Sequence, residues 1–72
     1  MEYSYRNQLT ASEVLRMRDI MADCPIQVRA SDGSLIEKGW AYQDQNDIWP
    51  TREALDNFYL SDGRVNPDVL RE

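Results

Sequence analysis

Residues 10–25 read TASEVLRMRDIMADCP, and both ends of this segment carry signals that bound a helix. Thr10 and Glu13 have the spacing of a capping box, in which each side chain accepts a hydrogen bond from the other residue's backbone N–H. Pro25 lacks the N–H that a helix interior needs, and it disfavours the helical conformation at Cys24. The segment therefore predicts a helix from about Ala11 to Ala22.

The apolar residues of this helix predict which side is buried. At helical spacing one side carries Ala11, Val14, Leu15, Met21 and Ala22, with Met17 at its margin. Arg16, Asp19 and Asp23 lie on the opposite side and are expected to face solvent. Cys24, a lone cysteine before Pro25, is expected to be a small buried residue.

Residues 25–43 alternate between apolar and polar types, which is typical of half-buried strands. The apolar members of the alternation are Ile26, Val28, Ala30, Ile36, Trp40 and Tyr42. A three-residue loop over 31–33, with Gly33 in the left-handed conformation, places all of these large groups on one face. A two-residue turn would divide them between two faces. We therefore predict an antiparallel hairpin over about 25–43 with the three-residue loop.

Residues 43–47 are a polar loop, and Thr51 then provides an N-cap for a second helix ending near Asp62 and Gly63. Arg52 and Asp56 are spaced as an exposed ion pair on that helix. Its predicted apolar stripe consists of Ala54, Leu55, Phe58 and Tyr59. Trp40 and Phe58 are assigned to the core.

The expected architecture is a small single α+β domain over residues 1–72, in the order α-β-β-α. Asn66 and Pro67 have the pattern of an N-cap followed by a first helical residue, which predicts a short C-terminal helical turn. Residues 1–9 are either an edge strand or a flexible arm. We favour the edge strand, because a chain this short has little core.

Composition excludes several kinds of function. The chain has 72 residues, eight Lys and Arg against thirteen Asp and Glu, one Cys and no His. These residues cannot form an internal disulfide, a usual zinc site or a His-based catalytic arrangement. We expect a protein that is not an enzyme and binds no cofactor or metal. No apolar run is long enough to span a membrane and no signal peptide is visible, so we expect a cytoplasmic protein.

The acidic charge is concentrated in one part of the chain. Residues 44–72 hold three basic and seven acidic residues, a net charge of −4 out of the total of −5. Trp49 lies between the acidic loop and Pro50, and Trp and Tyr are enriched at binding hot spots. The candidate partner-binding residues are Trp49, Asp44, Asp47, Glu53, Asp56 and Tyr42. The competing interpretation is a solubilising surface, with Trp49 as a cover over the core.

These features favour a protein-binding module, an adaptor or inhibitor of a larger intracellular enzyme or complex, whose partner has a basic surface. Small acidic domains of this kind are common among phage and mobile-element accessory proteins. One alternative is a small dimeric DNA-binding regulator that uses Arg6, Arg16, Arg18 and Arg29, although the negative net charge opposes binding to phosphates. Another is a structural subunit of an assembly. A homodimer would also suit a domain with so small a core.

Overall fold

The computed structural model describes residues 8–71, and its first element is the predicted helix. α1 spans Ala11–Asp23, and Thr10 is its N-cap. Both bonds of the capping box form. The Thr10 N–H donates to Glu13 Oε1 over 2.9 Å, and the Glu13 N–H donates to Thr10 Oγ1 over 3.4 Å. Cys24 adopts an extended conformation, so α1 ends before Pro25 as predicted.

The predicted buried side of α1 is only partly correct: Val14 and Met21 are half-buried against the core, but other members of that side are not. Met17 and Ile20 are its buried residues, whereas Ala11, Leu15 and Ala22 are exposed. Apolar side chains occupy much of the circumference between residues 14 and 22, so their spacing alone does not fix which side meets the core. The prediction of a buried Cys24 is also wrong. The thiol is exposed because Cys24 follows the last turn of α1, beyond the buried Ile20.

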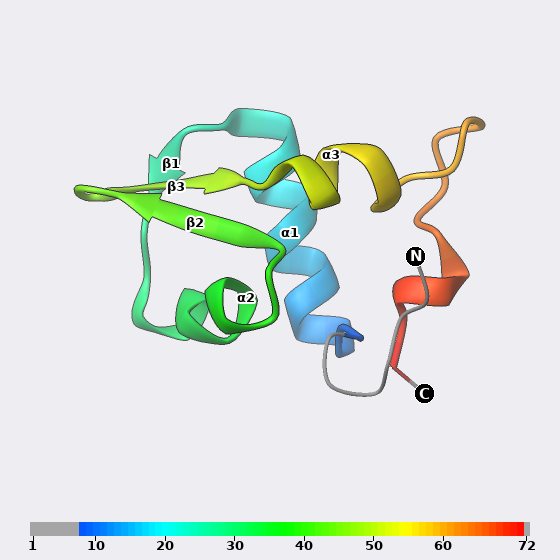
Figure 1. Cartoon of the computed structure of the whole chain (residues 1–72), viewed down its shortest axis with the longest axis horizontal. Helices are drawn as coiled ribbons and strands as arrows, with labels where there is room; N and C mark the ends of the chain where they lie inside the picture. Colours follow the sequence, from blue (N-terminus) through cyan, green and yellow to red (C-terminus); the bar gives the residue numbers. More distant parts are fainter. Residues whose placement is uncertain (1–7, 72) are drawn as a thin grey trace.

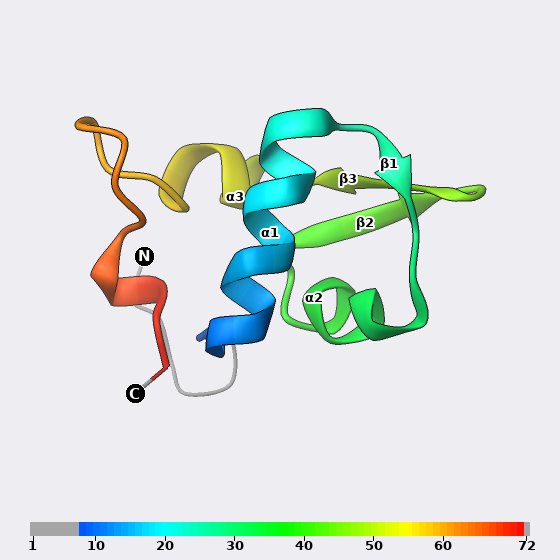
Figure 2. The ribbon, with the colours of Figure 1, turned by 180° about the vertical axis from the view of Figure 1, so that it is seen from behind.

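The sheet has three antiparallel strands, β1 (Ile26–Gln27), β2 (Ala41–Asp44) and β3 (Asp47–Pro50). β3 lies in the centre, with Ile48 opposite Ile26 of β1 and Trp49 opposite Tyr42 of β2. α1 packs against one face of this sheet, mainly on β3, and leaves the other face uncovered (Figure 1). Viewed from behind, α1 lies in front of the strands (Figure 2).

The hairpin predicted over 25–43 is wrong, and so is its three-residue loop. The middle of that segment is helical, with a 3-10 turn η1 (Ala30–Asp32) followed by the short helix α2 (Gly33–Glu37). The hairpin instead joins β2 to β3 through residues 45–46. Asp32 explains the change, because its carboxylate accepts a 2.8 Å hydrogen bond from the Arg29 N–H and so favours a turn over a strand.

α3 (Arg52–Asn57) begins at the predicted N-cap, where Thr51 Oγ1 accepts a hydrogen bond from the Ala54 N–H. It ends earlier than predicted, because the chain turns away after Phe58 and pairs Tyr59 with Val65. Gly63 has a φ of +89°, so it occupies the left-handed conformation within this turn and does not end the helix. Leu55 was predicted to be buried and is exposed, since α3 turns only Ala54 fully inward.

The predicted C-terminal helical turn is confirmed as η2 (Pro67–Val69), with Asn66 accepting a hydrogen bond from the Asp68 N–H. The edge-strand prediction falls mostly on residues 1–7, which lie outside the described residues. Leu9, which is described, forms an isolated parallel bridge with Leu70. Its N–H donates to the Val69 carbonyl over 2.7 Å, so the start of the described chain is bonded to its end.

The predicted core residues Trp40 and Phe58 are both buried, and their rings meet edge to face at a centroid distance of 6.4 Å. Eight further apolar residues complete the core: Leu9, Met17, Ile20, Leu35, Ala41, Ile48, Ala54 and Val69. The small α+β domain in the order α-β-β-α is confirmed at this level. Among residues 8–71, no helix combines the length and apolar character needed to cross a membrane.

Candidate functional site

The β2–β3 hairpin brings four of the six predicted partner-binding residues onto one face. Tyr42 lies opposite Trp49, and Asp44 lies opposite Asp47. Side chains alternate between the two faces of a strand, so these two pairs share a face. Ile48, which lies between Asp47 and Trp49, is buried against α1. The pairs therefore point away from the core, and we call Tyr42, Trp49, Asp44 and Asp47 the hairpin face.

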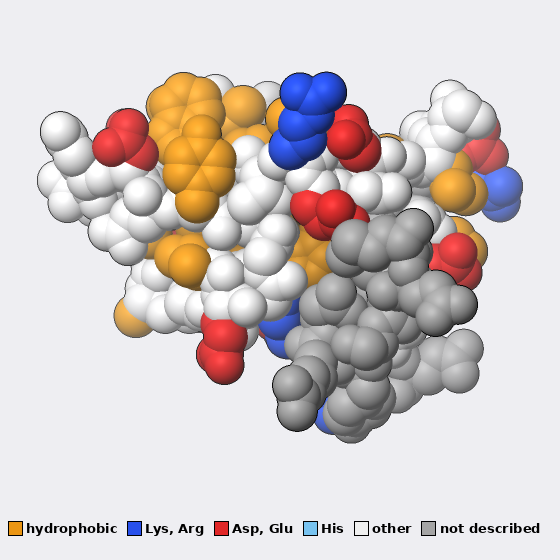
Figure 3. All heavy atoms as spheres, in the orientation of Figure 1, with side chains coloured by type: hydrophobic (Ala, Val, Ile, Leu, Met, Phe, Trp, Pro, Cys, Tyr) orange, Lys and Arg blue, Asp and Glu red, His pale blue; other side chains and the backbone are white. Residues whose placement is uncertain are grey.

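The hairpin face is open to solvent. Tyr42 is 48% exposed, both aspartates are exposed, and Trp49 is half-buried. Hydrophobic side chains gather over the hairpin with an acidic side chain beside them toward the hairpin tip (Figure 3). Gln27 of β1 pairs with Asp47 and extends this face by one residue. The structure thus places Trp49 neither in the core nor on a loop, but beside Tyr42 on a strand.

The turn at the tip holds Gln45 at a φ of +57°, a conformation that non-glycine residues rarely adopt. The side-chain amide of Gln43, near the end of β2, donates a 2.7 Å hydrogen bond to the Gln45 carbonyl. This bond supports the turn. This two-residue turn sets the register of the hairpin. It therefore determines that Asp44 and Asp47, which flank the turn, lie opposite each other.

The other two predicted residues lie on α3, immediately after β3, and both have neighbours within the chain. Asp56 and Arg52 form the predicted ion pair with 3.6 Å between Oδ2 and Nε, but the two side chains are 61% and 90% exposed. An exposed pair of this kind contributes little to stability. The Glu53 carboxylate accepts a 3.1 Å hydrogen bond from the Asn57 amide. Basic and acidic side chains therefore border the hydrophobic part of the surface over α3 (Figure 3).

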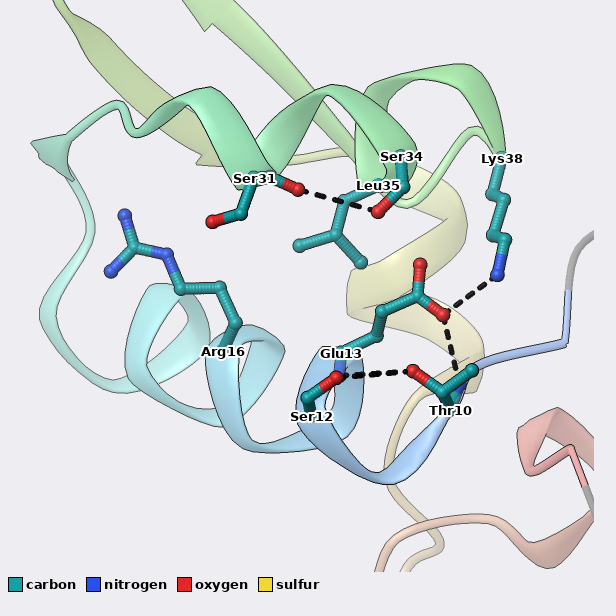
Figure 4. A pocket seen from close by; sticks show the side chains of 8 residues that line it. All are labelled: Thr10, Ser12, Glu13, Arg16, Ser31, Ser34, Leu35 and Lys38. Carbon is teal, nitrogen blue, oxygen red and sulfur yellow. Dashed lines mark hydrogen bonds and ion pairs between the residues drawn. The ribbon is translucent and has the colours of Figure 1, made fainter.

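A second group of polar residues, whose clustering the sequence did not predict, lines a hollow of about 400 Å³ between α1 and α2 (Figure 4). Lys38 Nζ donates to Glu13 Oε1 over 2.7 Å and to the Gln8 carbonyl over 2.9 Å. The hollow is bordered by Thr10, Ser12, Glu13, Arg16, Ser31, Ser34, Leu35 and Lys38. Its charged groups bind partners within the protein, which is the pattern of a structural network.

The second ion pair of this network is buried. Arg16 Nε donates to Asp32 Oδ1 over 2.8 Å, and a terminal nitrogen of the same guanidinium donates to Asp32 Oδ2 and to the Gln27 carbonyl. The hydrogen bond to Asp32 raises the pKa of Arg16, burial opposes this, and the charges of Asp32 and Asp19 add to the rise. Arg16 therefore links α1 to β1 and η1, and the prediction that it faces solvent is wrong. Because Arg16 is bound to Asp32, it is not free to contribute to a basic DNA-binding surface.

The pKa of Glu13 predicts how the free energy of unfolding depends on pH. Burial of its carboxyl acts to raise the pKa. The Lys38 ammonium, the Thr10 N–H and the Ser34 and Thr10 hydroxyls outweigh burial and lower the pKa from 4.5 to about 2. Because the folded-state pKa is depressed, the stabilisation is complete above pH 4.5 and is lost as the pH falls from about 4.5 to 2. A shift of this size corresponds to roughly 3 kcal/mol before solvent screening, so the measured loss is expected to be smaller.

We expect urea titrations between pH 6 and 2 to show this loss in wild type and a shallower loss in a Glu13→Gln variant. The variant should already be less stable at neutral pH. Asp32, whose pKa is also lowered, supplies the acid dependence that remains in the variant. Equal slopes in the two proteins would show that Glu13 does not contribute.

A comparison with protein families, curated proteins and solved structures finds no match to this chain. Among the described residues, no three His, Cys, Asp or Glu side chains lie close enough together to hold a metal ion. The function is therefore inferred from the geometry of the hairpin face.

Proposed function

We propose that the hairpin face binds a partner protein with a basic surface, and that the chain acts through this contact, as an adaptor or an inhibitor, without chemistry of its own. The observation that carries the proposal is the cross-strand pair of Tyr42 and Trp49 on the solvent side of the sheet. Aromatic residues of these two types dominate binding energy where a partner excludes water from them.

The carboxylates support a basic partner. Asp44 and Asp47 lie directly opposite each other across the strands, and like charges in this position destabilise a sheet. A Lys or Arg from a partner would relieve the repulsion, so the arrangement is less favourable in the free protein than in such a complex. The net charge of −4 over residues 44–72 would also speed the encounter with a basic surface.

The structure lends less support to the DNA-binding alternative. Of the four arginines considered for that surface, Arg16 is bound to Asp32 and Arg6 lies outside the described residues. Arg18 and Arg29 are exposed and come from different elements. A fixed Arg in a buried pair positions helices and is not available to a phosphate.

We expect Trp49→Ala to weaken partner binding at least tenfold, about 1.4 kcal/mol or more, while the melting temperature changes little. The measurement captures proteins from a lysate of the source cells on wild type, Trp49→Ala and Ile36→Ser, and quantifies each recovered protein. Ile36 is an exposed apolar residue on α2 that lies outside the hairpin face, so its variant is the matched control. A true partner is lost only from Trp49→Ala.

The double variant Asp44→Asn and Asp47→Asn tests the charge. Its binding to the captured partner should depend less on salt than that of wild type, because exposed charges are screened. If Trp49→Ala recovers the same proteins in the same amounts as wild type, the hairpin face is not the binding surface. A large loss of stability in Trp49→Ala would place the residue in the core and remove the proposal.

A further inference from the structure

The outer side of α1 carries a surface that the hairpin face does not use. Leu15, Arg18, Asp19 and Ala22 are spaced three and four residues apart, so they form one stripe along the helix. All four are exposed, Leu15 to 61%. We call these four residues the α1 stripe. α1 lies on the covered side of the sheet, whereas the hairpin face is on its uncovered side (Figures 1 and 2).

The α1 stripe borders a shallow hollow. Its four residues and Tyr59, which follows α3, line a space of about 370 Å³. Tyr59 is half-buried, and its ring packs edge to face on the core residue Phe58 at a centroid distance of 4.8 Å. This contact fixes the side of the hollow that Tyr59 forms. Ala22, which has a small side chain, also lines the hollow. A branched apolar side chain from another molecule could enter here.

We propose that a second copy of this chain covers the α1 stripe, with the two α1 helices antiparallel about a two-fold axis that passes between Arg18 and Asp19. Under this symmetry the order of the stripe is reversed in the partner copy. Leu15 then lies opposite Ala22 of the other copy, and Arg18 lies opposite Asp19 of the other copy. The large residue meets the small one, and each charge meets its opposite, twice in the dimer.

The charges of the stripe make a second copy the best occupant. In the described part of the chain, neither the Arg18 nor the Asp19 side chain forms a hydrogen bond or ion pair, although the Asp19 charge acts on the nearby Arg16 guanidinium, which is already paired with Asp32. A generic apolar partner would leave both charges without a partner at the centre of the contact, which is costly when they lose water. A second copy pairs both, and its Leu15 fills the hollow between Ala22 and Tyr59.

The size of the contact sets the expected affinity. A helix of thirteen residues is about 20 Å long, so a contact made mainly by one helix from each copy falls below the 1,200–2,000 Å² of a standard stable interface. Dimerisation is therefore weak and depends on concentration. If the proposed function also holds, the dimer presents two hairpin faces, and a partner with two basic sites would bind it more tightly than it binds the monomer.

The test reverses the charge of Arg18 or Asp19. Sedimentation equilibrium then measures self-association up to about 1 mM protein. Wild type is expected to dimerise. Arg18→Asp places Asp opposite Asp at the axis, and Asp19→Arg places Arg opposite Arg, so each variant alone should self-associate at least tenfold more weakly. Mixed together, the two variants have opposite charges at both positions and should form a heterodimer. All substitutions are at exposed positions, and circular dichroism confirms that each variant is folded.

Leu15→Ser should abolish the dimer, whereas Ile36→Ser, an exposed apolar residue on α2, should leave it unchanged. The proposal is overturned if wild type stays monomeric over the whole range, including the case in which the stripe binds a different protein. It is also overturned if the charge variants associate like wild type or if their mixture forms no heterodimer. None of these measurements involves the hairpin face, so they remain informative if the proposed function fails.

Discussion

Asp32→Ala is expected to lower the free energy of unfolding by about 3–5 kcal/mol, because it breaks a buried ion pair on one side only. Asp32 has no exposed surface, and it accepts hydrogen bonds from both Arg16 and the Arg29 N–H. Its loss leaves the guanidinium and a backbone donor without their acceptor. A domain of this length has only about 4–11 kcal/mol of stability in total. Urea unfolding followed by tryptophan fluorescence measures the change.

Two further variants make this result specific. Asp23→Ala removes an exposed carboxylate from the last turn of α1 and should change the unfolding free energy by less than about 0.5 kcal/mol. The double variant Arg16→Met and Asp32→Leu removes both charges and should recover part of the loss, but not the contribution of the Arg29 N–H. A change below about 1 kcal/mol for Asp32→Ala would show that the buried pair does not hold α1 to η1.

Trp40→Ala is expected to cost about 3–5 kcal/mol, as large-to-small changes of a buried Trp do. Trp40 is among the largest fully buried side chains, and its ring packs against Phe58. Its removal leaves a cavity beside Phe58 in the core. Thermal and urea unfolding should both report the loss.

Trp49→Ala is the matched comparison, because it removes the same side chain from the half-buried hairpin face. Its cost in stability should be small, at most about 1 kcal/mol, since less apolar surface is buried there. Equal losses from the two variants would contradict the assignment of Trp40 to the core and Trp49 to a binding surface. The pair of variants thus separates folding from binding with one residue type.

Part of the candidate site was predictable from the sequence. Trp49 beside a polar, acidic segment indicated a partly exposed aromatic residue, and it is half-buried. The pairing of Trp49 with Tyr42 is not predictable from the sequence, because the alternation over residues 25–43 places Tyr42 on a strand that pairs with residues 25–31. The α1 stripe was missed for a related reason. Leu15 and Ala22 are apolar, and apolar residues on a helix are normally assigned to the core.

Local hydrogen bonds determine what the sequence predicts correctly. The capping box of Thr10 and Glu13, the N-cap at Thr51 and the turn at Asn66 and Pro67 each depend on residues within three positions of one another. Such contacts form in the same way whatever the rest of the chain does. The start of each of these helical segments therefore follows from the sequence alone.

Tertiary contacts decide the conformation of residues 26–40. Their alternation of apolar and polar types fits a strand, yet only Ile26 and Gln27 form one in that segment. Arg16, sixteen residues before Asp32, binds the Asp32 carboxylate while the Arg29 N–H binds it from its own turn. Together with burial of Leu35, this outweighs the strand pattern and produces η1 and α2. A contact over that separation leaves no local pattern in the sequence, so only the folded structure reveals it.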